Sequence, residues 1–344
     1  MCLFLRKFNR SKTIFAMKIL LVLIMSTVFL STAAAQTATT YKKVDHVLWV
    51  VKEMKPVIKG WNSIGFTSYR DLKTVSVTKH GLKDEKAKVK AVEGALGGLN
   101  VLWIQPINGD DILSRHLAKN GEGAVAIIHK VTDQKQLDGL VSELAKANIG
   151  KIATYTFETK NGNLHYTIMD TREQGKYYLG FVIDERTGLT ALTGENFQNL
   201  NFNQFAFAIR DPEPVSGFWA SAGLPAFEIT HGELWDKEYF GKPANFDMNL
   251  GWQRHGNIVY EWCIPLKSPT VYEDFIRVHG EGIQHFGFAV KDMDEAIKFF
   301  TDKGYKISQS GGWGEKGEKG SGRFAYVDLS RIGGMTIELL WNQN

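Results

Sequence analysis

The stretch GEGIQHFGFAVKDMDEAIKFFTDKGY, from Gly280 to Tyr305, decides the fold of this chain because its opening and its order of elements recur earlier. A strand-like apolar run leads through a turn at Asp292 into a segment with helical apolar spacing. The same order begins at Gly121 as GEGAVAI, 159 residues earlier, and its turn contains Asp133. A strand followed by a helix is therefore a repeating unit.

A second pair of matching segments lies upstream of each of these. The run VDHVLWVV from Val44 precedes a segment ending WNSIGF, and FNQFAFAI from Phe202 precedes a segment ending WASAGL. The copies align without a gap at a shift of 158 residues, so Trp61 corresponds to Trp219. Repeats at a constant spacing indicate duplicated structural units.

The order of elements predicts an α+β fold of four βαβββ modules in two tandem domains. Each copy continues into further strand-like runs, such as 258–264 and 335–341. A length of 344 residues suits two domains, and 44% hydrophobic and 23% charged residues are ordinary globular values. We expect an N-terminal domain at 36–185 and a C-terminal domain at 200–344, joined by a largely polar linker.

The first 35 residues predict a signal peptide. Five basic residues accompany an apolar run at 19–30, and Ala33 and Ala35 satisfy the small-residue rule for cleavage. The apolar run is short for a transmembrane span, and no other stretch approaches ~20 apolar residues. We expect a mature chain that begins near Gln36 and a periplasmic or secreted protein.

The charge of the expected mature chain is close to neutral. Removal of 1–35 lowers the 41 basic residues to 36, against 37 acidic residues. Such a balance offers no electrostatic reason to bind nucleic acid or an anionic membrane. Cys263 would be the one remaining cysteine, which rules out an intramolecular disulfide.

The Gly280–Tyr305 stretch resembles the start of a module in the vicinal-oxygen-chelate superfamily. That superfamily holds glyoxalase I, methylmalonyl-CoA epimerase, extradiol dioxygenases and bleomycin-resistance proteins. The resemblance covers most of the mature chain. It implies that two modules curl their sheets into one cup with a divalent metal at its floor.

The resemblance also implies four metal ligands, one in the first and one in the last strand of each of two modules. In the C-terminal half these places hold Gln204, Glu261, His285 and Glu338. The set suits zinc, with nickel, cobalt or manganese as alternatives, and its order resembles one form of glyoxalase I. Taken singly, each carboxylate or amide is also consistent with a solvated strand end, and the histidine with a core residue.

The N-terminal copy provides an internal control. Its four corresponding places hold His46, Leu102, Ala126 and Gly180, so a single ligand type remains. We expect a degenerate site there, with His46 as a remnant or a structural histidine.

The resemblance implies a metal-dependent glyoxalase- or epimerase-like isomerase or lyase that acts on a small oxygenated substrate through an enediolate. Glu338 is the first choice for the catalytic base, and Glu261 is the second catalytic carboxylate. The places that bind glutathione in glyoxalase I hold Ala208, Pro265 and Glu281, so the glutathione site is not reproduced.

Two alternatives remain open. A metal-free binding protein of the bleomycin-resistance kind would use the aromatic residues of the cup. A two-domain dioxygenase would need two histidines and one carboxylate for iron, and Gln204 argues against it. The aromatic candidates are Trp219, Trp252, Trp262 and Trp313.

Two further stretches are candidate parts of the site. Trp252, Arg254 and His255 precede the strand of Glu261 and are predicted to bind substrate. Arg254 could hold a carboxylate of the substrate, and His255 could shuttle protons. The alternative is a polar hairpin turn. The glycine-rich stretch at 311–322 is interpreted as a mobile loop over the cup or as a plain hairpin connection.

Overall fold

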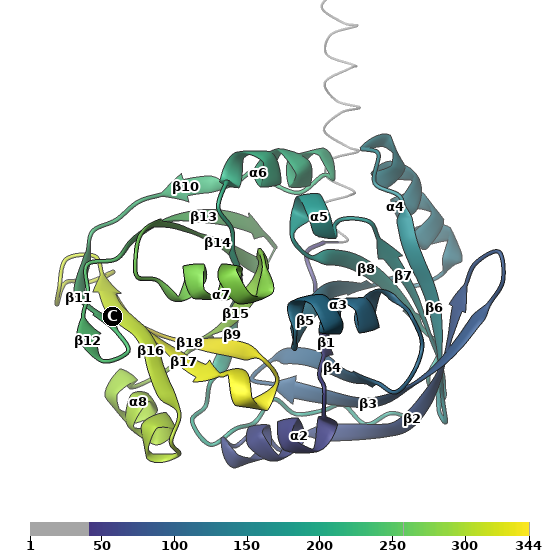
Figure 1. Cartoon of the computed structure of the whole chain (residues 1–344), viewed down its shortest axis with the longest axis horizontal. Helices are drawn as coiled ribbons and strands as arrows, with labels where there is room; N and C mark the ends of the chain where they lie inside the picture. Colours follow the sequence, from purple (N-terminus) through teal and green to yellow (C-terminus); the bar gives the residue numbers. More distant parts are fainter. Residues whose placement is uncertain (1–40, 257, 344) are drawn as a thin grey trace, which may run out of the picture.

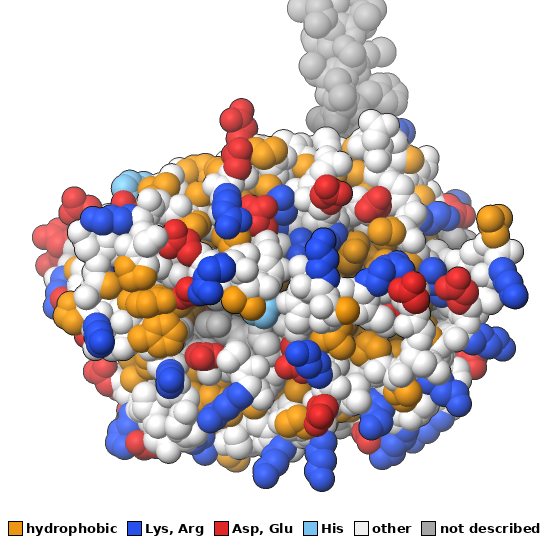
Figure 2. Space-filling view, viewed as in Figure 1, with side chains coloured by type: hydrophobic (Ala, Val, Ile, Leu, Met, Phe, Trp, Pro, Cys, Tyr) orange, Lys and Arg blue, Asp and Glu red, His pale blue; other side chains and the backbone are white. Residues whose placement is uncertain are grey.

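The computed structural model describes residues 41–256 and 258–343, which form two halves packed side by side (Figure 1). The predicted signal peptide and its cleavage site therefore lie outside the described residues. None of the helices in the described ranges is long and apolar enough to span a membrane. Basic and acidic side chains are interspersed over the face shown in Figure 2.

The first half is a closed barrel of eight strands in the order β1-β4-β3-β2-β6-β7-β8-β5. Its helices lie between strands in the chain, as the repeat predicts. The strands are β1 (His46–Val50), β2 (Tyr69–His80), β3 (Glu85–Leu96), β4 (Leu99–Pro106), β5 (Gly123–Lys130), β6 (Lys151–Thr159), β7 (Gly162–Met169) and β8 (Tyr178–Asp184), and the helices are α2 (Met54–Ser63), α3 (Ile112–Asn120), α4 (Gln134–Lys146) and α5 (Arg172–Gly175).

The second half is a ten-stranded sheet in the order β10-β13-β14-β9-β15-β18-β17-β16-β11-β12. The α+β prediction is confirmed, although the third module has extra short strands. The strands are β9 (Asn201–Ala208), β10 (Glu228–Thr230), β11 (Leu234–Tyr239), β12 (Lys242–Pro243), β13 (Asp247–His255), β14 (Ile258–Lys267), β15 (Gly282–Ala289), β16 (Lys306–Trp313), β17 (Gly322–Leu329) and β18 (Met335–Asn342), with helices α6 (Pro212–Ser221), α7 (Val271–His279) and α8 (Met293–Asp302) and the 3-10 helix η1 (Ser330–Ile332).

One strand position explains why the first sheet closes and the second does not. In the barrel, β2 pairs with β3 and, through residues 76–80, also with β6. In the second half the corresponding segment is split, because β10 pairs with β13 up to Thr230 and β11 pairs with β16 from Leu234 onward. Residues 231–233 cross between the two edges outside the ladder. The second cup is therefore left open along this crossing (Figure 1).

The interior of the first barrel is filled with apolar side chains. Leu102 and Ala126 are buried there beside Phe157 and Ile168, and α3 adds Ile112 from one end. Burial of this apolar surface stabilises the barrel and leaves its interior without ligand-type side chains at those two places. In the second half, by contrast, the apolar cluster fills only part of the cup.

The repeated tryptophans join the two halves. Trp61 Nε1 donates to the carbonyl of Ile332 at 3.0 Å, and its counterpart Trp219 donates to the carbonyl of Gly175, also at 3.0 Å. Each bond crosses from one half to the other, and both rings are fully buried. The largest apolar cluster likewise contains residues of both halves. The duplication thus produces a pseudosymmetric interface.

Candidate metal centre

Four neighbouring strands each bring one of the predicted donor side chains to the inner face of the second sheet. Gln204 lies on β9, Glu261 on β14, His285 on β15 and Glu338 on β18, and these strands are adjacent in the order β14-β9-β15-β18. All four side chains are buried. The structure therefore brings together the four residues that the sequence singled out.

The donor atoms lie within hydrogen-bonding range of one another. Gln204 Nε2 donates to Glu261 Oε2 at 2.8 Å and to Glu338 Oε2 at 3.1 Å. His285 Nε2 lies 3.4 Å from Glu261 Oε2 and 3.3 Å from Glu338 Oε2. The other ring nitrogen of His285 contacts the side-chain oxygen of Gln284, which fixes the orientation of the ring.

Gly287 makes room for the centre. In the sheet it is paired with Gln204 on one side and with Glu338 on the other. A Cβ atom at this position would lie 2.6 Å from Cγ of Gln204 and 3.1 Å from Cδ1 of Leu340. The glycine is needed here for space, so that the amide of Gln204 can reach the two carboxylates.

The electrostatics of the centre favour a cation. Burial and the neighbouring Glu338 raise the pKa of Glu261 above its usual value. Burial alone would lower the pKa of His285, but its contacts with Glu261 and Glu338 raise it to about 9. Two acidic side chains thus share one imidazole and one amide in a buried site. A divalent cation would balance the two carboxylates after the imidazole gives up its proton.

The donor set fits a zinc-like ion. Carboxylate oxygens and an imidazole nitrogen are ordinary zinc ligands, and the convergence of three of them is what such a site requires. Gln204 presents its Nε2 to the carboxylates, and a half-turn of the amide exchanges this nitrogen for Oε1. The side chain can therefore stabilise the carboxylates or provide its oxygen as a fourth ligand.

Cys263 is a further candidate donor, and it was not predicted from the sequence. Donor atoms of Glu261, Cys263 and His285 all lie within 4.8 Å of one another. The spacing between Glu261 and Cys263 was the available signal, because residues i and i+2 of a strand point to the same face. From the sequence, Cys263 was considered only as a partner for a disulfide bond.

An open cavity of about 770 Å³ lies above the donors. Its size is in the usual range for a small-molecule site. Gln204, Glu261 and Glu338 form part of its lining, together with Tyr272 and Tyr326. The remaining wall combines apolar side chains with polar and charged ones. The apolar ones are Leu234, Met248, Leu250, Trp252, Val259, Trp313, Phe324 and Leu340, and the charged or titratable ones are His231, Glu233, Arg254 and Glu315.

Of the predicted substrate-binding residues, Trp252 and Arg254 line the cavity and His255 does not. The guanidinium of Arg254 lies over the ring of Trp252, 4.6 Å from its centroid. His255 is the next residue along β13, so it points to the opposite face, where it is buried edge-on against Tyr260. The structure therefore places His255 away from the cavity, unlike Trp252 and Arg254.

Two of the four tryptophans proposed for the binding cup line the cavity, and two do not. Trp313 lines the cavity with Trp252, whereas Trp219 and Trp262 are fully buried in the core shared by the halves. The glycine-rich stretch begins within β16, and residues 314–321 form the hairpin connection to β17. Gly314 and Glu315 of this connection reach the cavity wall.

The corresponding places in the first half contain no converging set. His46 already has protein partners on both ring nitrogens, Asp45 Oδ2 at 2.7 Å and the Tyr166 hydroxyl at 3.1 Å. Leu102 and Ala126 belong to the packed barrel interior. At Gly180 a Cβ atom would meet Ile128 Cδ1 at 2.5 Å, so apolar side chains occupy this space.

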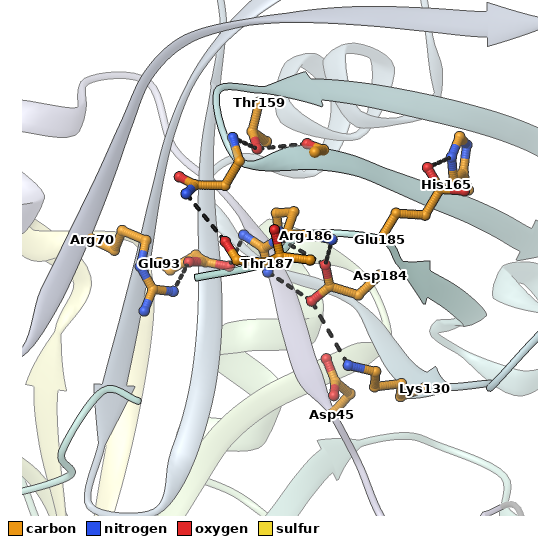
Figure 3. Close-up of polar contacts among 12 residues, drawn as sticks. Asp45, Arg70, Glu93, Lys130, Thr159, His165, Asp184, Glu185, Arg186 and Thr187 are labelled. Atoms are coloured by element: carbon orange, nitrogen blue, oxygen red, sulfur yellow. Dashed lines mark hydrogen bonds and ion pairs between the residues drawn. The ribbon is translucent and has the colours of Figure 1, made fainter. Parts of the chain in front are cut away.

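The first barrel contains a network of ion pairs around Arg186 (Figure 3). Arg186 bonds Glu93 at 2.6 Å and Asp184 at 2.8 Å, and Arg70 also pairs with Glu93. Asp184 also lies 3.9 Å from Lys130. Glu93 and Asp184 are therefore paired with arginine and lysine, and Asp45 is paired with His46, in contrast to the two glutamates of the second cup.

Residues 203–326 match the model of the Glyoxalase/Bleomycin resistance protein/Dioxygenase superfamily, which confirms the resemblance for this part of the chain. Among curated proteins, none matches the chain.

Solved structures resemble both halves together. A variant of 4-hydroxymandelate synthase from Streptomyces coelicolor is 12% identical, and the match covers 88% of this chain and 93% of that protein with a TM-score of 0.56. A Mn(II)-bound glyoxalase from Novosphingobium aromaticivorans is 12% identical, with 87% and 82% covered and a TM-score of 0.43. The halotolerant catechol dioxygenase BphC is 11% identical, with 88% and 87% covered and a TM-score of 0.43. At such identities the first match shows a shared fold across the two halves.

Proposed function

We propose, on the premise that residues 203–326 belong to the glyoxalase, bleomycin resistance protein and dioxygenase superfamily, that this chain is a metal-dependent isomerase or lyase. Its active site is the open cup of the second half. The observation that carries the proposal is the convergence of Gln204, Glu261, His285 and Glu338 beneath a cavity large enough for a small molecule.

The chemistry follows from the positions of the donors. When bound, a divalent metal supplies a Lewis acid that stabilises the charge developing on neighbouring substrate oxygens as a proton leaves the adjacent carbon. Glu338 lines the cavity and takes this proton at a carboxylate oxygen. Glu261, on the other module, lines the same cavity and is placed to return a proton to a neighbouring carbon or to the other face of the same carbon.

The cavity wall indicates the shape of the substrate. Trp252 and Trp313 offer apolar surface for a hydrophobic body, and Arg254 lies beside Trp252 at the wall. The side chain of Arg254 is exposed and stacks on Trp252, so its charge is available to a substrate anion. We therefore expect a small molecule with vicinal oxygens at one end and an apolar body that carries a carboxylate.

Proton abstraction can be tested without knowledge of the product. Purified zinc-loaded protein is incubated in D₂O with a panel of 2-hydroxy and 2-oxo acids that bear apolar side chains, and exchange at the carbon next to the oxygens is followed by NMR. Exchange by the wild type that falls at least about 100-fold in Glu338→Gln supports the proposal, because an amide cannot take the proton. Exchange that is equal in the two proteins would contradict the role of Glu338.

A metal-free small-molecule binding protein is the second candidate, and one observation favours it. Gln204 donates a hydrogen bond to each carboxylate, and the pKa of His285 is raised to about 9 by Glu261 and Glu338, so a protonated imidazole can balance part of their charge without an ion. The two candidates differ in metal content. A binding protein of this kind would keep its ligand affinity in the presence of a chelator, whereas the proposed enzyme would lose its metal and its activity.

The donor set argues against an iron-dependent dioxygenase. The described residues of the centre include a single imidazole, that of His285, where the facial arrangement for iron needs two histidines and one carboxylate. Gln204 occupies the place of the other histidine.

We also propose that the protein is exported to the periplasm or secreted. The basic start, the apolar run at 19–30 and the small residues Ala33 and Ala35 support this proposal. Mass spectrometry of protein from the native cells should find an N-terminus near Gln36. An intact N-terminus on cytoplasmic protein would contradict export.

A further inference from the structure

We propose that Cys263 is a fifth donor of the metal centre, and that its sulfur directs the centre toward thiophilic divalent ions such as zinc, cobalt and cadmium rather than magnesium or manganese. This inference rests on the proposed function, because it requires that a metal binds at the floor of the second cup. It assigns a role to the cysteine that the four-residue set does not contain.

The register of β14 places the thiol beside the other donors. Glu261 and Cys263 are two residues apart on the same strand and face the interior of the cup, while Trp262 between them faces the core shared by the halves. Donor atoms of Glu261, Cys263 and His285 lie within 4.8 Å of one another. A small inward movement of these side chains would bring all three to a single ion.

The thiol lies close to the cavity but behind its wall. Cys263 is fully buried and does not line the cavity, whereas Glu261 and Glu338 do. Its surroundings are an apolar cluster that includes Val271 and Ile276, and also Tyr272, which lines the cavity. A sulfur ligand in this position would take up no space in the cavity, which would stay available for substrate oxygens.

The ligand chemistry gives the preference for the ion. Thiolate sulfur is a soft donor that favours zinc and related ions, whereas magnesium and manganese prefer sites made of oxygen ligands. When the sulfur–metal bond forms, the sulfur–hydrogen bond breaks, and the proton passes to the solvent without any change in oxidation state. No additional reactant is needed.

The test uses cobalt(II) as the probe in the full chain. Stripped wild-type protein is titrated with Co²⁺, and the absorption spectrum is recorded through the near ultraviolet and the visible. We expect visible d–d bands that report bound cobalt, together with an intense near-ultraviolet sulfur-to-cobalt charge-transfer band. The charge-transfer band should be lost in Cys263→Ser while the d–d bands remain, and Cys263→Ala provides a second variant if the serine protein does not fold.

The outcomes separate this inference from the proposed function. Cobalt d–d bands without a charge-transfer band would overturn the role of Cys263 and leave the metal centre in place. Failure of the wild type to bind cobalt at all would overturn both. Competition provides an independent readout: Cys263→Ser should reduce the preference for Zn²⁺ over Mn²⁺ by at least about 10-fold. An unchanged preference would contradict the inference.

Discussion

The Nε2 atom of His285 lies 3.3 Å from Oε2 of Glu338, and both side chains are buried at the floor of the second cup. The two residues come from the parallel neighbours β15 and β18, near the start and at the end of the last module. In the first barrel the corresponding pair is Ala126 and Gly180, whose space is filled by apolar side chains. The duplication therefore gave one cup with donors and one with a packed interior.

Removal of the imidazole should abolish most metal binding. His285→Ala deletes the nitrogen donor and leaves two buried carboxylates without their common partner. We expect the zinc content per chain, measured by plasma mass spectrometry at matched pH, to fall at least about 10-fold. His46→Ala is the matched control in the first half, and it should retain the wild-type content. Equal loss in both variants would mean that the ion is shared between the halves or bound in both.

A methyl group at residue 287 should disturb the centre without touching a donor atom. Gly287→Ala would place its Cβ 2.6 Å from Cγ of Gln204, so the amide must move away from the carboxylates. We expect about 10-fold weaker zinc binding by calorimetry and a stability loss of about 1–3 kcal/mol.

Gly217→Ala is the control for that substitution. Gly217 lies in α6, and a Cβ atom there would meet nothing within 4 Å. This variant should bind zinc as the wild type does and should be slightly more stable, because alanine is favoured in a helix interior. Wild-type zinc affinity in Gly287→Ala would show that Gln204 contributes nothing to the centre.

Loss of one buried carboxylate should raise the thermal stability of the metal-free protein and reduce the stabilisation by zinc. Glu338→Gln removes one negative charge from the pair, and its amide oxygen can still accept the hydrogen bond from Gln204. In a chelator we expect a higher Tm than that of the wild type, since the like-charge contact with Glu261 is relieved while the imidazole of His285 keeps Glu261 as its partner. With excess zinc the wild type should gain more than the variant, because only the wild type keeps both ligands. Equal zinc-induced shifts in the two proteins would argue against Glu338 as a ligand.

His129 should make the metal-free protein less stable in acid. Burial lowers the pKa of His129 to about 4, although its bond to the carbonyl of Lys43 and the charge of Asp45 oppose this shift. Between about pH 6.5 and pH 4 the unfolded chain binds a proton there and the folded chain does not. This contribution to stability is therefore complete above pH 6.5 and decreases as the pH falls, by at most about 3 kcal/mol.

Urea unfolding between pH 7.5 and 4.5, in chelator, measures this effect. His129→Asn keeps a donor for the Lys43 carbonyl but does not titrate, so its stability should fall less steeply than that of the wild type over this range. Parallel pH profiles for the two proteins would exclude His129 as a source of the acid sensitivity.

The architecture could be predicted from the sequence because its periodicity is strong and duplicated. Trp61 and Trp219 marked the repeat, and both turn out to bond across the interface that the repeat creates. The openness of the second cup could not be predicted, since it depends on which edge β10 and β11 pair with. Such pairing is decided by contacts distant in sequence.

The site residues could likewise be predicted only in part from the sequence. Gln204, Glu261, His285 and Glu338 were expected from the resemblance to the vicinal-oxygen-chelate superfamily, and the strands bring them together. Arg254 and His255 were expected to lie together at the site. They are successive residues of β13, so their side chains point to opposite faces of the sheet. By the same alternation, Cys263 lies two residues after Glu261 and points to the same face, which would have indicated it as a candidate donor.

The most direct test of the account is a crystal structure of the zinc-loaded protein with data collected at the zinc absorption edge. We predict one strong anomalous peak per chain, within ~2.0 to 2.2 Å of the imidazole nitrogen of His285 and of oxygens from Glu261 and Glu338. The first barrel should contain no peak. The absence of a peak among these residues in crystals shown to contain stoichiometric zinc, or a peak beside His46 instead, would contradict the account.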